Sequence, residues 1–237
     1  MGNIAIIGRE TKETVVEEVG TSLGRRIDLQ VAFQKLNALS YECIKRLIDI
    51  VGSLLLLLIA APFMLLIAVL IALDSPGPIL FRQLRYGKGG RVFTLYKFRT
   101  MHVGAEKMRA SLWAVSDMKG GFKLRNDPRV TRVGRFLRIY SLDELPQLFN
   151  VFKGEMSLVG PRPHPLDEFD PSNPQHREIL SVKPGLTCLW QVSGRNMLSF
   201  EEWVRLDLHY VRNRSLLLDL AILGRTIPAV ISAYGAF

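Results

Sequence analysis

Two adjacent carboxylates, Asp143 and Glu144, are the sequence feature best suited to chemistry. They stand near the start of residues 141–152, SLDELPQLFNVF, whose apolar positions recur at helical spacing. An ionised carboxylate can attack phosphorus or bind Mg²⁺ beside a diphosphate, and its neighbour can serve as a base or a second metal contact. The simpler alternative is a capping box, with Ser141 as N-cap and Glu144 three residues later. Pro146 disfavours that box, because it would lie beyond the first turn of a helix beginning after Ser141.

Basic residues that could hold an anion follow this pair. Either interpretation places the carboxylates at a helix N-terminus, which also attracts phosphate. Arg162 stands between two prolines in the motif GPRP, so a stiff backbone could preset its guanidinium for bidentate phosphate binding, although a rigid surface turn is the alternative. Arg195, beside a glycine, is another candidate anion contact. The sequence shows no metal-ligand spacing among its histidines and cysteines, and no P-loop, GxGxxG, GxSxG or HExxH motif.

An uncharged run at residues 50–73 predicts contact with a membrane. As a helix it would reach roughly 36 Å, which is enough to cross a bilayer. Pro62 at its middle would kink the helix. Basic residues flank both ends: Lys35, Lys45 and Arg46 before it, and Arg82, Arg85, Lys88, Arg91, Lys97 and Arg99 after it. Both ends then belong on the cytoplasmic side. This pattern favours a re-entrant membrane helix at about residues 44–73 over a single spanning helix with a tolerated proline.

Composition narrows the class of protein further. The 237 residues carry a net charge of +9, yet 48% are hydrophobic and the mean hydropathy is +0.16. A disordered polycation or a nucleic-acid arm would be rich in charge and poor in apolar residues. The net charge is the only feature that favours a nucleic-acid binder, and the uncharged run is evidence against that class of protein. The balance suggests a protein that meets an anionic surface or anionic substrates.

The predicted fold class is an α+β membrane protein, mostly helical, with amphipathic interfacial helices and a small β-hairpin. Residues 1–40 form an N-terminal extension of one or two helices, and residues 41–237 form the main domain. Two apolar runs flank a glycine-rich turn at residues 87–90, which predicts the hairpin. Asp127 before a proline suggests the start of a basic helix. Its arginines recur every third residue: Arg129, Arg132, Arg135 and Arg138. That helix suits a lipid headgroup surface or a polyanion, and equally the solvated face of a core helix.

A series of motifs carries a resemblance that covers roughly residues 41–233. In order they are KRLID, a proline-broken apolar segment, FRQLRYG, YKFRTM, DPRVTRVGRFLR, SLDELPQLFNVFKGEMSLVGPRP, KPGLTCLWQVSGRN and HYVRNRSLLLDLAI. This series resembles the bacterial sugar transferase family of monotopic phosphoglycosyl transferases. Eight motifs in one order are far more specific than any one of them.

The resemblance implies an enzyme that transfers a sugar-1-phosphate from a UDP-sugar to polyprenyl (undecaprenyl) phosphate and releases UMP. It implies Asp143 as the nucleophile of a covalent phosphosugar intermediate and as a contact for Mg²⁺, with Glu144 as its partner acid. The basic residues that match substrate-binding positions are Lys97, Arg138, Arg162 and Arg195. The reaction would be the first membrane step of exopolysaccharide assembly, at the cytoplasmic face of the bacterial inner membrane, with glucose or galactose as the sugar. The partners would be the two substrates and membrane lipids, with no nucleic acid.

Two positions depart from the family pattern: Cys188 replaces a glycine of KPGLTG, and Ala61 precedes Pro62 where some members have Ser or Pro.

A hypothesis from another functional class is a non-catalytic scaffold at the membrane surface, whose arginines bind anionic lipid. In that case Asp143 and Glu144 would serve only as helix caps.

Overall fold

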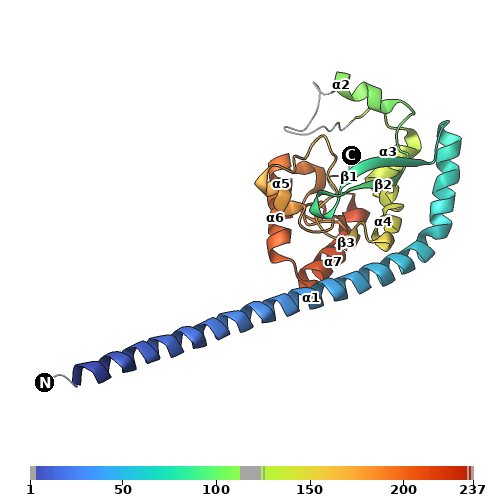
Figure 1. Cartoon of the computed structure of the whole chain (residues 1–237). Coiled ribbons are helices and arrows are strands. Elements are labelled where there is room, and N and C mark those ends of the chain that lie inside the picture. Colours follow the sequence, from blue (N-terminus) through green and yellow to red (C-terminus); the bar gives the residue numbers. More distant parts are fainter. Residues whose placement is uncertain (1–3, 113–123, 125, 234, 236–237) are drawn as a thin grey trace. The chain divides into compact units, whose positions relative to one another are not determined.

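The computed structural model describes the backbone of residues 4–112, 124, 126–233 and 235, and within these ranges the side chains from residue 39 onward except those of residues 109, 110 and 196. The chain divides into two compact units, Met1–Lys45 and Arg46–Phe237. Helix α1, Ile4–Asp74, supplies the described part of the first unit and continues into the second (Figure 1). Everything that positions the carboxylate pair lies in the second unit.

The second part of α1 is strongly apolar and poorly covered by protein. Among the described residues, Leu39–Asp74 is the helical segment long and apolar enough to cross a membrane; an 18-residue window within it has a mean hydropathy of 3.1, and 11% of that window is buried. Leu58, Phe63 and Leu65 are 65%, 62% and 70% exposed. Pro62 lies inside the helix, and Figure 1 shows α1 turning sharply before its end at Asp74. An exposed apolar surface of this size is typical of a segment that contacts a membrane or another protein.

The predicted hairpin is confirmed. Strand β1, Leu80–Tyr86, pairs antiparallel with β2, Val92–Phe98, across a short 3₁₀ turn, Lys88–Gly90. Gly89 and Gly90 adopt φ values of 69° and 76° in this turn, a left-handed conformation that glycine takes without steric cost. Because side chains alternate between the two faces of a strand, Phe81, Gln83 and Arg85 share a face with Lys97 across the register.

The basic helix begins later than the sequence predicts. Helix α3, Arg132–Ile139, is capped by Thr131, whose Oγ1 accepts a hydrogen bond from Gly134 N at 3.0 Å. Asp127 was the expected start and is not the cap, because both of its carboxylate oxygens accept hydrogen bonds from the Arg129 guanidinium, at 2.9 and 2.6 Å. Arg129 is therefore buried before the helix instead of lying on its basic face.

The remaining elements complete the second unit. They are η2 Ala105–Met108, α2 Arg109–Leu112, η4 Leu142–Glu144, α4 Gln147–Lys153, β3 Ser157–Val159, α5 Pro174–Ile179, β4 Gly185–Thr187, η5 Trp190–Val192, η6 Arg195–Met197, α6 Phe200–Asn213 and α7 Leu216–Ser232. Strand β3 pairs parallel with β4 and forms a second two-stranded sheet. The core is built from β2, α4, β3, α6 and α7 through Leu95, Leu148, Val151, Met156, Leu158, Val159, Tyr210 and Ile222. The mostly helical α+β class is thus confirmed.

The start of the apolar segment is fastened to this core by two polar side chains. Arg46 donates from Nη1 and Nη2 to the carbonyl oxygens of Val151 and Phe152, both at 2.8 Å, at the C-terminal end of α4. Asp49 is buried, and its Oδ1 accepts hydrogen bonds from Ser157 Oγ at 2.9 Å and Leu158 N at 2.8 Å.

The end of the segment is fastened to the same unit. Arg99, which follows β2, is buried and donates to the carbonyl oxygens of Ser75 at 2.5 Å and Pro76 at 3.0 Å. Ile67 and Ile71 pack into a cluster with Phe98 and Leu137. Both ends of the apolar segment therefore contact one body of protein.

We expect Asp49→Ala to lower the free energy of unfolding by about 2 kcal/mol or more, because it leaves two buried donors without their acceptor. Chemical unfolding in detergent, followed by tryptophan fluorescence, measures this. Glu201→Ala, at an exposed position in the first turn of α6, is the control and should change stability little. Equal unfolding midpoints for the two variants would contradict the anchoring role of Asp49.

Candidate active site

The carboxylate pair lies in the 3₁₀ turn η4, directly before α4. Asp143 and Glu144 are 7% and 8% exposed. The capping-box alternative is wrong, because Ser141 has a left-handed backbone, φ 53°, and its side chain makes no cap hydrogen bond. Such a backbone is strained for a residue with a side chain, and strain of this kind is typical of functional sites. Two other described non-glycine residues have a positive φ: Arg195, with 52°, which lies at the same site, and Ala233.

Glu144 is held by two cations that come from distant parts of the chain. Lys97 Nζ on β2 donates to Glu144 Oε1 at 2.7 Å, and Arg162 Nη2 donates to the same oxygen at 2.9 Å. Gln191 Nε2 approaches the other oxygen at 3.5 Å. Burial by itself raises the pKa of Glu144, but the charges and hydrogen bonds of Arg162 and Lys97 outweigh it and hold that pKa well below its usual range. Glu144 is therefore a fixed anion.

Asp143 is left far less engaged than its neighbour. Among the described residues it forms an ion pair with Lys97 Nζ at 3.7 Å and no hydrogen bond. Burial raises the pKa of Asp143, the negative charge of Glu144 adds to that rise, and Lys97 and Arg138 oppose it. On acidification the pair therefore takes up its first proton at Asp143. Its carboxyl oxygens keep unused lone pairs that an incoming group can meet.

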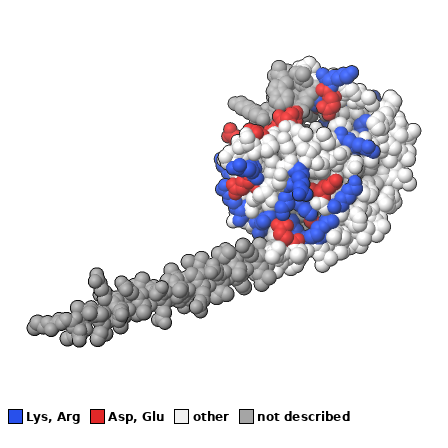
Figure 2. Space-filling model, in the orientation of Figure 1, with Lys and Arg blue, Asp and Glu red and all other residues white. Residues whose placement is uncertain are grey.

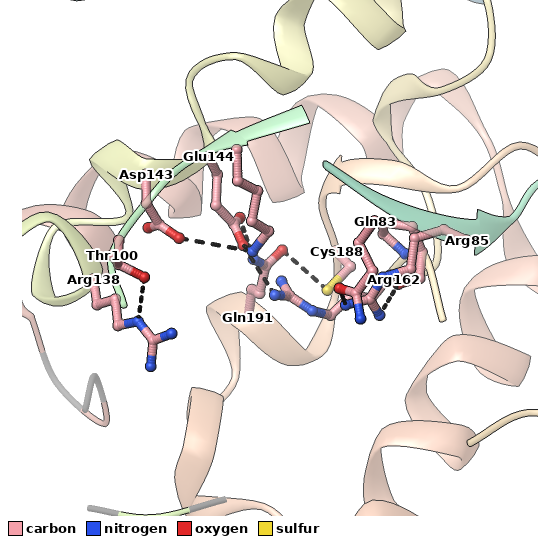
Figure 3. Close-up of polar contacts among 11 residues, drawn as sticks. Gln83, Arg85, Thr100, Arg138, Asp143, Glu144, Arg162, Cys188 and Gln191 are labelled. Atoms are coloured by element: carbon pink, nitrogen blue, oxygen red, sulfur yellow. Dashed lines mark hydrogen bonds and ion pairs between the residues drawn. The ribbon is translucent and has the colours of Figure 1, made fainter. Parts of the chain in front are cut away.

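All six residues singled out from the sequence line one cavity of about 550 Å³. They are Lys97, Arg138, Asp143, Glu144, Arg162 and Arg195. Figure 3 shows the labelled side chains in a row, with Arg138 and Asp143 at one end, Glu144 next, and Arg162 and Arg85 at the other end. On the surface, Lys and Arg side chains gather on the face of this unit that Figure 2 presents.

The cations around the carboxylates are fixed by their own contacts. Arg138 Nε donates to Thr100 Oγ1 at 2.9 Å, and burial lowers the pKa of Arg138. The Arg162 guanidinium lies over the Trp190 ring, 5.4 Å from its centroid. Trp190 in turn stacks on Trp203 at a centroid distance of 4.4 Å. These contacts predispose the guanidinium groups for an anion, because less side-chain freedom remains to be lost on binding.

Two residues that line the cavity, Arg85 and Gln191, escaped the sequence reasoning, as did the role of Cys188 behind Gln191. Cys188 Sγ donates to Gln191 Oε1 at 3.1 Å, which leaves the amide NH₂ of Gln191 directed at Glu144. Burial raises the pKa of the Cys188 thiol, so it stays protonated as that donor. Arg85 was counted only as a basic flank of the membrane segment, although strand alternation within the predicted hairpin places it on the face of Lys97.

A known protein family matches most of the chain. The profile of the bacterial sugar transferase family matches residues 40–233. The chain belongs to this family. Membership accounts for the shared order of motifs from the apolar segment to α7.

The chain is similar to several curated family members. It is 44% identical over 199 residues to galactosyl transferase CpsE of Streptococcus agalactiae, covering 83% of this chain and 44% of that protein. It is 44% identical over 203 residues to undecaprenyl-phosphate galactose phosphotransferase of Salmonella typhimurium, covering 84% and 42%. It is 41% identical over 204 residues to UDP-glucose:undecaprenyl-phosphate glucose-1-phosphate transferase of Caulobacter vibrioides, covering 81% and 72%. The chain spans less than half the length of the first two relatives.

The lowered pKa of Glu144 sets a pH window for stability. Its ionised form contributes stability above pH 4.5, the ordinary value of a glutamate, and that contribution is lost as the pH falls below 4.5. We expect Glu144→Gln to be less stable than the wild type, by a margin that is constant from pH 8 to pH 6 and shrinks below 4.5. Thermal unfolding across this range measures it, and a margin that persists unchanged to pH 3 would contradict the assignment.

Proposed function

We propose that the chain transfers a sugar-1-phosphate from a UDP-sugar to polyprenyl phosphate and releases UMP. The observation that carries the proposal is the division of labour between two buried neighbours: Glu144 is bound by Lys97 and Arg162, and Asp143 is free to react. Family membership and the activities named for the relatives from Salmonella typhimurium and Caulobacter vibrioides support the same reaction. Their sugars, galactose and glucose, are the substrates to try first.

In the first step, an Asp143 carboxylate oxygen attacks the phosphorus that carries the sugar. An acyl phosphate bond forms, the bond from that phosphorus to the bridging oxygen breaks, and UMP leaves with the bridging oxygen and its electron pair. Lys97 and Arg162 face the cavity and can neutralise charge on the phosphoryl oxygens and the departing phosphate. Glu144 holds both cations in position, which removes the cost of reorganising them during the reaction.

In the second step, a phosphate oxygen of polyprenyl phosphate attacks the same phosphorus. The acyl phosphate bond breaks, Asp143 recovers its carboxylate, and the product is a polyprenyl diphosphate sugar. Arg138 lies on α3, close to the exposed residues Arg135 and Phe136 of the same helix. This position suits Arg138 to bind the lipid phosphate. Two successive displacements let a soluble substrate and a lipid substrate use one pocket in turn.

Mg²⁺ fits this site as a partner of the substrate. The described residues contain no cluster of three or more His, Cys, Asp or Glu side chains that could hold a metal ion by themselves. Mg²⁺ is commonly bound by one or two carboxylates together with substrate phosphates, and the Asp143 carboxylate offers such a ligand. When bound, the ion would neutralise diphosphate charge.

We also propose that residues 44–73 form a re-entrant membrane helix and that the site faces the cytoplasm at the bacterial inner membrane. Arg46 and Asp49 at one end, and Ser75 at the other, all contact the second unit. A straight spanning helix would place these ends on opposite sides of the bilayer. The basic residues on both flanks favour the cytoplasmic side.

We expect Asp143→Asn to lower turnover at least about 1000-fold, because an amide cannot form the acyl phosphate. The assay uses purified protein in detergent with labelled UDP-galactose or UDP-glucose, Mg²⁺ and a polyprenyl phosphate. Without the lipid, the wild type should release UMP in an amount equal to the enzyme present and carry a phosphosugar on the Asp143 peptide.

The control for this experiment is Asp170→Asn, an exposed aspartate whose contacts are with Ser172. It should keep full turnover. Full turnover by Asp143→Asn would overturn the mechanism. If the wild type binds vesicles according to lipid charge and salt but never consumes a UDP-sugar, the scaffold hypothesis replaces the enzymatic one.

Cysteine labelling tests the re-entrant topology. Cys43 is exposed before the apolar segment, and Val103, 68% exposed, lies after it. A membrane-impermeant maleimide should label native Cys43, and Val103→Cys in a Cys43→Ser background, from the same side of membrane vesicles. Cys43→Ser alone is the blank, because Cys188 is buried. Labelling from opposite sides would show a spanning helix.

A further inference from the structure

We propose that Arg85, together with Arg162, forms a phosphate subsite that holds the nucleotide phosphate, on the side of Glu144 away from Asp143. The inference rests on the proposed function, since it assigns this subsite to the UMP half of a UDP-sugar. Arg85 on β1 lines the same cavity as Asp143 and Arg162.

Two hydrogen bonds hold the Arg85 side chain in place, and other N–H groups of its guanidinium have no partner among the described residues. Its Nη1 donates to the Pro163 carbonyl oxygen at 3.0 Å, and its Nη2 donates to Gln83 Oε1 at 2.6 Å. Its Nε is buried and has no hydrogen-bond partner among the described residues. A guanidinium carries five N–H groups, so most of its donors remain available. A buried donor without a partner is costly, and a bound phosphate oxygen would remove that cost.

The backbone next to Arg85 is joined to the segment that carries Arg162. Tyr86 N donates to the His164 carbonyl oxygen at 3.1 Å, and Arg85 forms an isolated antiparallel bridge with Pro165. Arg85 and Arg162 are therefore held at a set separation by strand β1 and the GPRP motif. Such preorganisation suits two guanidinium groups that bind one phosphate between them.

The two guanidinium groups differ in whether a carboxylate neutralises them. Glu144 pairs with Arg162, whereas none of the described carboxylates lies within 4.0 Å of the Arg85 guanidinium. Burial and the positive charge of Arg162 lower the pKa of Arg85 to about 10, although Glu168, Glu144 and Asp167 act in the opposite direction. A phosphate between the two groups would replace this repulsion with two attractions.

The position of the subsite follows from the order of side chains along the cavity. Figure 3 shows Asp143 on one side of Glu144, and Arg162 and Arg85 on the other. The phosphorus under attack must lie beside Asp143, so the second phosphate of a diphosphate extends toward Arg162 and Arg85. Negative charge develops on that second phosphate as the bridging bond breaks, and Arg85 would stabilise it.

The test measures UMP binding and the exchange of labelled UMP into UDP-sugar, with the full chain in detergent. The exchange needs no lipid and therefore reports the first step alone. We expect Arg85→Gln to raise the Kd for UMP and the KM for UDP-sugar about tenfold or more, because a charge-assisted contact is lost. The KM for polyprenyl phosphate should stay within about twofold of the wild-type value. Arg85→Lys, which keeps the charge but not the fork, should lose less.

Arg82→Gln is the matched control on the same strand. Its side chain is exposed, lies 5.9 Å from the Tyr96 ring centroid, and points to the other face of the hairpin from Arg85. UMP binding should be unchanged in this variant. If Arg85→Gln does not fold, Arg85→Lys decides by the same measurements.

The outcomes separate this inference from the proposed function. Wild-type turnover combined with unchanged UMP affinity in both Arg85 variants would overturn the subsite and leave the function standing. A raised KM for polyprenyl phosphate alone would also overturn it, because the phosphate held would be that of the lipid. If the wild type shows neither exchange nor turnover, the proposed function fails. Titration with inorganic phosphate then decides the anion subsite: weaker binding by Arg85→Gln supports it, and equal binding overturns it.

Discussion

The site depends on one interaction, the buried contact of Glu144 with Lys97 and Arg162. Lys97 comes from the hairpin, 47 residues before Glu144 in the chain, and Arg162 from the GPRP motif, 18 residues after it. A single carboxylate therefore joins three segments. Breaking it would leave two cations with their anion missing in a mostly buried place, which is far more costly than losing a surface ion pair. Because Glu144 holds these two cations, the Asp143 carboxyl group is not needed to bind them.

The apolar segment of α1 and the site are connected by direct hydrogen bonds and by neighbouring residues in the chain. Arg46 and Asp49 bind α4 and β3 at the start of the apolar segment, and Arg99 binds the carbonyl groups at its end. Arg99 directly follows β2, the strand that carries Lys97. The position of the site relative to the apolar segment is thus set by a short stretch of chain and by direct hydrogen bonds.

Local signals in the sequence predicted much of the fold. The hairpin followed from two apolar runs around a glycine-rich turn, and the long, exposed apolar segment of α1 followed from its length and lack of charge. Predictions about caps were less successful. Ser141 and Asp127 both had the right residue type for a helix start, but Ser141 is held in a left-handed turn and Asp127 is occupied by Arg129. Residue type alone therefore does not predict a cap, because the backbone conformation and the donor that the side chain binds, here one only two residues away from Asp127, decide it.

The sequence by itself determined the chemical inventory: an acidic pair, a proline-framed arginine, a hairpin and an uncharged segment broken at Pro62. These features depend on residue type and on neighbours a few positions away. Only the tertiary structure decided that Glu144 is bound and Asp143 is available, and that Arg85 lies beside Arg162. The reason is physical: burial and charge act through space, so the state of each ionisable group depends on segments far from it in the chain.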